Sequence, residues 1–228
     1  MTHDSSAPAS SPRERRAPSD DGVLRVGLIG RAGSGKTTVA NAWRERGAEV
    51  LEADRIGHQV TDGDPEVRAA LIAEYDAEVY LADGRLDRAR VAARVFRDSE
   101  ALARLDHLVH PRILAKLRDS LAARARSGER GVVVIDAALL LRWRFERECD
   151  VVVAVVAPQA RQIERLIAGR GWTEAQARER LAAQLPDEAL AAAADEVIEN
   201  DGTLEQLVAH ARRVLDSLVA RPRGSAPA

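Results

Sequence analysis

One short stretch, Leu24-Arg-Val-Gly-Leu-Ile-Gly-Arg-Ala-Gly-Ser-Gly-Lys-Thr-Thr38, constrains the fold more than any other part of the chain. Its apolar beginning, residues 24–29, predicts a buried strand. The strand leads into a glycine-rich turn, residues 30–37, which matches the phosphate-binding pattern G-x-x-x-x-G-K-[ST] at every fixed position. A helix is expected over residues 38–46. Strand, turn and helix therefore follow in the order that this motif requires.

The residue types of this turn suit a site for nucleotide phosphates. Glycines allow backbone conformations that are closed to other residues, and they let amide N–H groups approach phosphate oxygens. The helix start, near Lys36, adds partial positive charge. We expect Lys36 to reach the β- and γ-phosphates of ATP and the Thr37 hydroxyl to hold Mg²⁺. The chain has only one other lysine, Lys116. The predicted ATP-binding residues of the turn are Gly33, Ser34, Gly35, Lys36, Thr37 and Thr38.

Composition restricts the classes of partner. The 228 residues carry a formal net charge of -2, with an isoelectric point near 6.2, so no overall field attracts nucleic acid or an anionic membrane. The single cysteine, Cys149, rules out an internal disulfide framework, suits a reducing compartment and is interpreted as a packing residue. No apolar run is long enough to span a bilayer. We expect a cytoplasmic protein, a monomer or weak oligomer, that acts on small molecules.

Two carboxylates follow predicted strands. Asp54 comes just after a short strand at residues 49–52, and Asp136 ends a buried strand at residues 131–136. Ligands of open parallel sheets bind beyond the carboxyl ends of the strands. Asp54 could therefore orient an attacking hydroxyl or accept its proton, or it could cap a helix that starts near residue 55. Asp136 is the expected second magnesium residue, acting directly or through water.

The segment from residue 64 to residue 127 is predicted to be almost wholly helical. Apolar residues recur at helical spacing over residues 65–75, 87–96, 99–108 and 111–125. This block is too long for a simple crossover, so we interpret it as an insertion that binds the second substrate. His110 precedes Pro111, which we place at the first position of the last of these helices. Arg88 could meet an anionic substrate, although a helix-start role for His110 and a solvated face for Arg88 stay open.

The remainder alternates strands and helices. A strand is expected at residues 151–156, helices at 159–168 and 174–184, a strand at 196–199 and a last helix from Thr203 to about residue 219. Arg165 and Arg170 are interpreted as arginines of a mobile lid that stabilises charge during phosphoryl transfer, although a surface role is equally open. Together these elements predict a doubly wound α/β domain.

An ordered series of motifs resembles the dephospho-coenzyme A kinase family over nearly all of residues 24–217. The series comprises Gly33-Ser-Gly-Lys-Thr-Thr38, Glu52-Ala-Asp54, Ala82-Asp-Gly-Arg-Leu-Asp-Arg88 with Val95-Phe96, His110-Pro111, Asp136 with Leu139-Leu140, Gln162-Ile-Glu-Arg165, Arg180-Leu-Ala-Ala-Gln184 and Asp195-Glu-Val-Ile-Glu-Asn200. The phosphate-binding turn alone indicates only a superfamily of nucleotide-binding proteins. The order and spacing of the other motifs narrow the resemblance to one family.

The resemblance implies transfer of the ATP γ-phosphate to the ribose 3′-hydroxyl of dephospho-coenzyme A, the last step of coenzyme A synthesis. It implies a five-stranded parallel sheet ordered 2-3-1-4-5 and Asp54 as the catalytic base or hydroxyl-orienting residue. It further implies a lid carrying Arg165 and Arg170 within about residues 159–186, and Asn200 near the adenine of ATP. Arg88 and His110 are the candidate acceptor-binding residues.

The domain boundaries follow from the same pattern. A kinase domain is expected over residues 23–220, with its core at 23–63 and 128–220 and the insertion at about 64–127. Residues 1–22 and 221–228 are rich in Ser, Pro, Ala and charge, which favours disordered tails.

Five positions depart from the family pattern: Arg31, Ala138, Arg142, Gly169 and Leu190. The family usually has glycine in place of Arg31, proline in place of Ala138 and an acid in place of Arg142. It usually has the second lid arginine in place of Gly169 and a basic residue in place of Leu190. Because none of these positions changes the conserved phosphate motif or Asp54, we expect chemistry to persist and lid geometry to differ.

Three alternatives remain. Another small-metabolite or nucleoside kinase would share the phosphate turn and the lid but would have a different insertion. A GTPase switch would need an Asn-Lys-x-Asp segment, which the sequence lacks. A catalytically silent ATP-binding regulator is suggested by Arg142 and Leu190, whereas Lys36, Thr37 and Asp54 argue against it.

Overall fold

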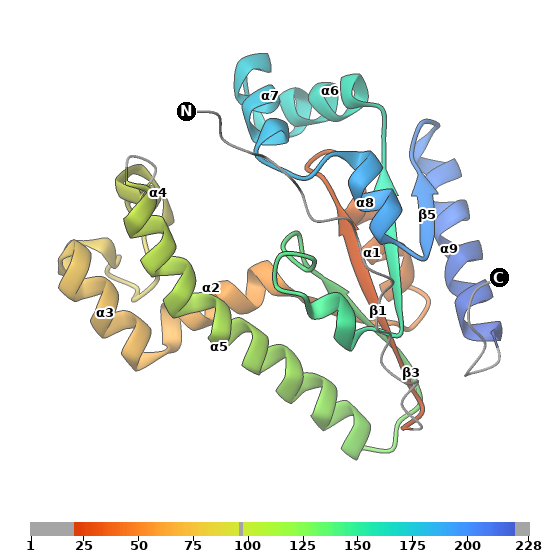
Figure 1. Ribbon diagram of the computed structural model, residues 1–228, viewed down its shortest axis with the longest axis horizontal. Helices are drawn as coiled ribbons and strands as arrows, with labels where there is room; N and C mark the ends of the chain where they lie inside the picture. Colours follow the sequence, from red (N-terminus) through yellow and green to blue (C-terminus); the bar gives the residue numbers. More distant parts are fainter. Residues whose placement is uncertain (1–20, 96–97, 222–228) are drawn as a thin grey trace, which may run out of the picture.

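The computed structural model describes residues 21–95 and 98–221. Of the predicted tails at residues 1–22 and 221–228, residues 1–20 and 222–228 lie outside this range, whereas Arg221 is described and forms an ion pair with Glu196 of the sheet. The described residues form one five-stranded parallel sheet in the order β2-β3-β1-β4-β5, as expected (Figure 1). Its strands are β1 (Val23–Gly30), β2 (Glu49–Glu52), β3 (Gly131–Asp136), β4 (Val151–Val156) and β5 (Glu196–Glu199).

Strand register brings the ends of the central strands together. Asp136, the last residue of β3, lies opposite Leu28 of β1 and Glu52 of β2. β3 and β4 are Val-rich runs whose middle residues are buried, as expected for strands covered on both faces. The phosphate-binding turn after β1 and Asp54 after β2 therefore leave the sheet at the same edge.

Helices flank both faces of the sheet. They are α1 (Lys36–Arg44), α2 (Ala53–Gly63), α3 (Pro65–Tyr75), α4 (Arg88–Val95), α5 (Ser99–Arg126), α6 (Gln159–Arg170), α7 (Glu174–Ala182), α8 (Asp187–Ala193) and α9 (Leu204–Ala220), with 3₁₀ turns η1 (Ala77–Val79) and η2 (Phe145–Glu148). None of the helices within the described ranges is both long and apolar enough to cross a membrane.

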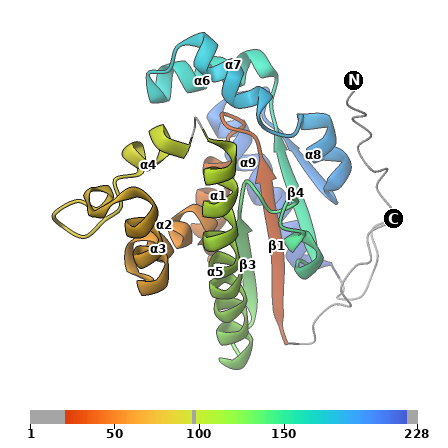
Figure 2. The ribbon, with the colours of Figure 1, turned by 60° about the vertical axis from the view of Figure 1, so that its left-hand side comes forward.

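Two apolar cores lie on opposite faces of the sheet. α1 and α9 pack on one face, where the buried Trp43 indole donates a hydrogen bond to the Ala211 carbonyl over 2.7 Å. The other core joins α2, α3 and α5 to the segment after β3, including Leu140 and Phe145. α3 and α4 extend away from the sheet on the side of α5, whereas α6 and α7 form a separate pair beyond one end of the sheet (Figures 1 and 2).

The expected break before Pro111 is wrong. Residues 99–126 form one continuous helix, α5, with Pro111 inside it. Proline removes one backbone hydrogen bond, but apolar residues of the helix are buried both before this position, as Val109 is, and after it, as Ile113 and Leu117 are. Tertiary packing therefore outweighs the local helix-breaking signal. Asp98 caps the helix start by accepting from the amides of Glu100 and Ala101.

Smaller differences concern other elements. The phosphate-loop helix begins at Lys36, as expected, but ends at Arg44, two residues before the expected end, and α8 was not predicted. Asp21 and Gly22, assigned from the sequence to the tail, join the folded domain, where the Gly22 carbonyl accepts a hydrogen bond from the Gly131 amide over 3.2 Å. Cys149 is buried, as its packing role requires.

Candidate active site

The phosphate loop has the conformation that its glycines permit. Gly33 and Gly35 have φ angles of 75° and 99°, in the left-handed region. A Cβ atom on Gly33 would lie 2.6 Å from the Gln162 carbonyl oxygen, and one on Gly35 would lie 2.3 Å from the Asn200 amide nitrogen. Close packing as well as backbone conformation therefore requires glycine at both positions.

Two side chains hold this loop, Asn200 just after β5 and Arg165 on α6. The buried Asn200 amide donates to the Ser34 carbonyl over 2.7 Å, and Arg165 donates to the Gly33 carbonyl over 3.1 Å. Arg165 also donates to the Asn200 side-chain oxygen over 3.1 Å. The predicted site residues Arg165 and Asn200 thus meet at the phosphate loop. They bind the backbone carbonyls of Gly33 and Ser34, and they do not occupy the amide N–H groups at the start of α1.

Lys36 and Asp136 form an ion pair at the sheet edge. Their side chains are only 18% and 10% exposed. Thr37, in the first turn of α1, is exposed and adjacent in sequence. The structure thus brings the predicted phosphate lysine together with the predicted magnesium carboxylate.

The donors at this edge fit Mg²⁺. A threonine hydroxyl and a carboxylate are hard oxygen ligands, and Mg²⁺ in kinases takes only one or two protein ligands beside phosphates and water. Residues 21–95 and 98–221 contain no cluster of three or more His, Cys, Asp or Glu side chains that could enclose a metal ion.

The end of α7, within the segment predicted to be a lid, is bonded to the loop by residues that the sequence did not identify as contacts. The Arg31 guanidinium donates to the Leu181 carbonyl of α7 over 2.6 Å, and the Gln184 side chain accepts from the Ala32 amide over 3.0 Å. Arg170 lies elsewhere, at the end of α6, with its guanidinium 5.2 Å from the centre of the Trp172 ring. The structure therefore brings Arg165, but not Arg170, to the phosphate loop.

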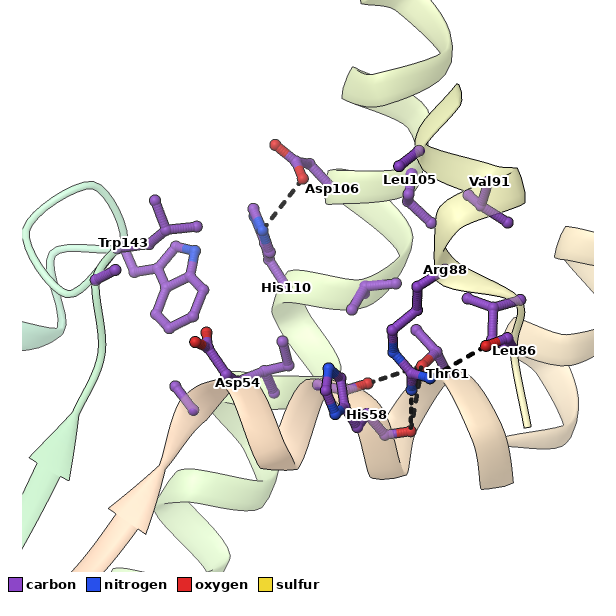
Figure 3. A pocket seen from close by; sticks show the side chains of 17 residues that line it. Asp54, His58, Thr61, Leu86, Arg88, Val91, Leu105, Asp106, His110 and Trp143 are labelled. Atoms are coloured by element: carbon purple, nitrogen blue, oxygen red, sulfur yellow. Dashed lines mark hydrogen bonds and ion pairs between the residues drawn. The ribbon is translucent and has the colours of Figure 1, made fainter. Parts of the chain in front are cut away.

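A cavity of about 450 Å³ lies beside this edge. Three helices and the segment after β3 supply its walls (Figure 3). The lining residues are Ala53, Asp54, Gly57, His58, Thr61, Leu86, Arg88, Val91, Ala92, Leu105, Asp106, Val109, His110, Ile113, Ala138, Leu139 and Trp143.

Asp54 lies in the first turn of α2, which begins at Ala53. The alternative that Asp54 caps this helix is wrong, because Glu52 occupies the cap position. Asp54 lines the same cavity as His110 and Trp143 (Figure 3). Since Glu52 pairs in register with Asp136, Asp54 follows the β2 end that adjoins the Lys36–Asp136 pair.

Arg88 also lines the cavity but is held by α2. It donates to the Asp62 carboxylate over 2.9 Å and to the Thr61 hydroxyl over 3.2 Å. Burial would raise the pKa of Asp62, but hydrogen bonds from the Leu86 amide and from Arg88 outweigh this effect and lower the pKa. The solvated-face interpretation of Arg88 is therefore wrong, because its guanidinium is ordered at the cavity wall.

His110 belongs to a small polar group on the opposite wall. Its Nε2 lies 3.2 Å from an Asp106 carboxylate oxygen, and its ring meets the Trp143 indole edge-on at 5.2 Å. Burial lowers the pKa of His110, the nearby Asp106 charge opposes this shift, and Arg142 adds to it. His110 is in the interior of α5, so its helix-start interpretation fails with the predicted helix boundary.

Asp106 and Trp143 were missed by the sequence reasoning. Asp106 stands four residues before His110, a spacing that would have signalled the contact if one continuous helix had been predicted. Trp143 lies in an irregular segment, where no periodicity gives the direction of a side chain. Among the departures, Leu190 is buried in the core and Gly169 is exposed, with open space where a side chain would lie.

Comparison with known proteins agrees with this arrangement. Residues 24–206 match the family model described as dephospho-CoA kinase. A Thermobifida fusca protein named dephospho-CoA kinase is 40% identical over 199 residues, covering 87% of this chain and 98% of the relative. A Chlorobaculum tepidum protein of the same name is 38% identical over 200 residues, with coverages of 86% and 95%.

Solved structures have the same fold. A crystal structure from Thermus thermophilus superposes with a TM-score of 0.71 at 30% identity and covers 86% of this chain and 96% of its own. A dephospho-CoA kinase from Campylobacter jejuni, at 18% identity, reaches a TM-score of 0.62, with coverages of 86% and 97%, and supports the fold alone. With a family match that spans most of its length, the chain belongs to the dephospho-CoA kinase family.

Proposed function

We propose that this protein phosphorylates the ribose 3′-hydroxyl of dephospho-coenzyme A with ATP. The observation that carries the proposal is the placement of Asp54 in a cavity beside the phosphate loop of a dephospho-CoA kinase family member. In the reaction the 3′-oxygen bonds to the γ-phosphorus, and the bond to the β–γ bridging oxygen breaks, which releases ADP. The hydroxyl proton leaves to Asp54 or, when Asp54 only orients the hydroxyl, to solvent.

The ATP phosphates would bind at the start of α1. The loop amides of Gly33 to Thr38 face the phosphate oxygens, and the Lys36 ammonium exchanges part of its contact with Asp136 for the β- and γ-phosphates. When bound to Thr37 and Asp136, Mg²⁺ would neutralise charge on the phosphate oxygens. Asn200, held against Ser34, would border the nucleotide near its adenine.

The lid residues have separate roles in this proposal. Arg165, already bonded to the Gly33 carbonyl, would stabilise charge that develops on the transferred phosphoryl group. Arg170, stacked near Trp172, would reach the phosphates only after the end of α6 moves. Arg88 and His110, on facing walls of the cavity, are the proposed acceptor contacts. The proposed setting is cytoplasmic, with the protein acting as a monomer or weak oligomer.

The test is ADP production from ATP and Mg²⁺ with dephospho-coenzyme A, adenosine, cytidine or shikimate as acceptor. Turnover with dephospho-coenzyme A, and a product whose added phosphate is on the 3′-oxygen by phosphorus NMR, is the expected result. Preference for another acceptor would overturn the substrate assignment. ATP binding without turnover on any acceptor would favour a silent regulator, and omission of Mg²⁺ tests the metal requirement.

A further inference from the structure

Asp106, which lines the cavity, contacts two side chains from different elements, His110 and Arg142. One of its carboxylate oxygens lies 3.2 Å from His110 Nε2, and the other lies 3.2 Å from an Arg142 nitrogen (Figure 3 shows the His110 contact). Asp106 and His110 belong to α5, whereas Arg142 belongs to the segment after β3. This ion pair therefore links the two walls of the cavity at its edge.

Arg142 does not line the cavity but pairs with the lining residue Asp106, and it differs from Arg88, which does line the cavity, in how many of its donors are used. Arg88 donates to Asp62, to the Thr61 hydroxyl and to two backbone carbonyls, so most of its guanidinium is committed. Within residues 21–95 and 98–221, the Arg142 side chain makes one hydrogen bond, to Asp106, and it is 66% exposed. A guanidinium has five N–H donors, so several on Arg142 are open to solvent beside Asp106.

The charges that line the cavity indicate how Arg142 could affect the binding of an anionic acceptor. Asp54 and Asp106 both line the cavity and carry negative charge when ionised, whereas Arg88, the arginine in the lining, is already paired with Asp62. Dephospho-coenzyme A carries an anionic diphosphate, which these carboxylates repel. Arg142 offsets the Asp106 charge and offers planar donors that match phosphate oxygens.

We propose that Arg142 is a specificity-determining residue that favours acceptors with a diphosphate, by neutralising the cavity residue Asp106 and presenting its free donors beside it. This inference rests on the proposed function, because it assigns a residue to recognition of the proposed acceptor. Arg142 does not touch the reacting atoms, so it acts on acceptor affinity and leaves the chemical step unchanged.

The test compares Arg142→Gln and Arg142→Lys with the wild-type protein. Replacement by Gln is expected to raise the dissociation constant and KM for dephospho-coenzyme A about fivefold, the effect of losing one exposed charge pair, with kcat within about twofold. Lysine keeps the charge and should restore most of the affinity. The dissociation constant should also depend less on salt concentration in Arg142→Gln than in the wild type, because the variant lacks a charge whose attraction salt screens.

A matched control is Arg147→Gln, which removes an equal charge from an exposed arginine of η2, five residues along the chain from the arginine that pairs with Asp106. Equal affinities and equal salt dependences for Arg142→Gln and Arg147→Gln would overturn the inference. A fall in kcat with unchanged KM would do so as well. Wild-type turnover with dephospho-coenzyme A is measured separately, so failure of the proposed function is distinguished from failure of this inference. Circular dichroism confirms that each variant is folded.

Discussion

Lys36 and Asp136 form an ion pair that joins the start of α1 to the end of β3. Replacing Lys36 by alanine removes the only lysine of the phosphate loop. ATP affinity and turnover should fall together, with affinity lower by about 10- to 100-fold, the range for losing a charge-assisted hydrogen bond. Calorimetric titration with ATP and steady-state kinetics measure the two effects.

The control for Lys36→Ala is Lys116→Ala, which removes the other lysine from an exposed position on α5. That variant should behave like the wild type. ATP binding by Lys36→Ala at wild-type strength would contradict the role of the loop lysine.

Asp54→Asn tests the proposed catalytic carboxylate. The amide keeps the shape of the side chain but cannot accept a proton, so kcat should fall by about 10²- to 10⁴-fold while ATP binding stays nearly intact. Asp119→Asn, at an exposed position of α5, is the matched control. Near-normal turnover by Asp54→Asn would remove Asp54 from the mechanism.

Arg31 offers a test of lid anchoring. Its guanidinium holds the Leu181 carbonyl near the end of α7, so Arg31→Gly should free this end of the lid. Amide hydrogen exchange within residues 174–184 should become about tenfold faster, as expected for the loss of one charged hydrogen bond. Arg178→Gln, which breaks only an exposed pair with Glu174 on the same helix, serves as the control. Identical exchange in the two variants would show that Arg31 does not anchor α7.

The sequence was sufficient for the sheet and the phosphate loop because both are specified locally. Val-rich runs mark β3 and β4, and the glycine pattern requires one backbone path around Lys36. The sheet order came from the family resemblance, since strand periodicity carries no information about neighbours. The hydrogen bond from Asn200 to Ser34 joins residues 166 positions apart, and no local pattern predicts such a contact.

The part of the cavity formed by α5 was harder to predict, because the helix-breaking signal of Pro111 conflicted with the packing of the helix. Pro111 favoured a helix start, and this hid the one-turn spacing between Asp106 and His110. Arg142 could be recognised as a departure from the family pattern, but its ion pair depends on how the segment after β3 packs against α5. Irregular segments have no period from which such contacts could be deduced.

His110 should make stability depend on pH. Its pKa is lowered in the folded protein, mainly by burial, relative to the ordinary value of about 6.5 in the unfolded chain. Between these two values the unfolded chain binds a proton that the folded chain does not. The free energy of unfolding therefore decreases as pH falls from about 6.5 to the folded pKa, and this contribution is fully present above 6.5.

His110→Gln should weaken this pH dependence, because glutamine does not titrate. Urea unfolding of both proteins at pH 7.5 and pH 5.5 measures the difference, with His210→Gln on α9 as the control for loss of another histidine. Arg142→Gln should also reduce the dependence, since Arg142 contributes to lowering the pKa of His110. The free energy of unfolding of the wild type should fall more between pH 7.5 and pH 5.5 than that of His110→Gln. An equal or smaller fall would show that the fold does not favour the neutral form of His110.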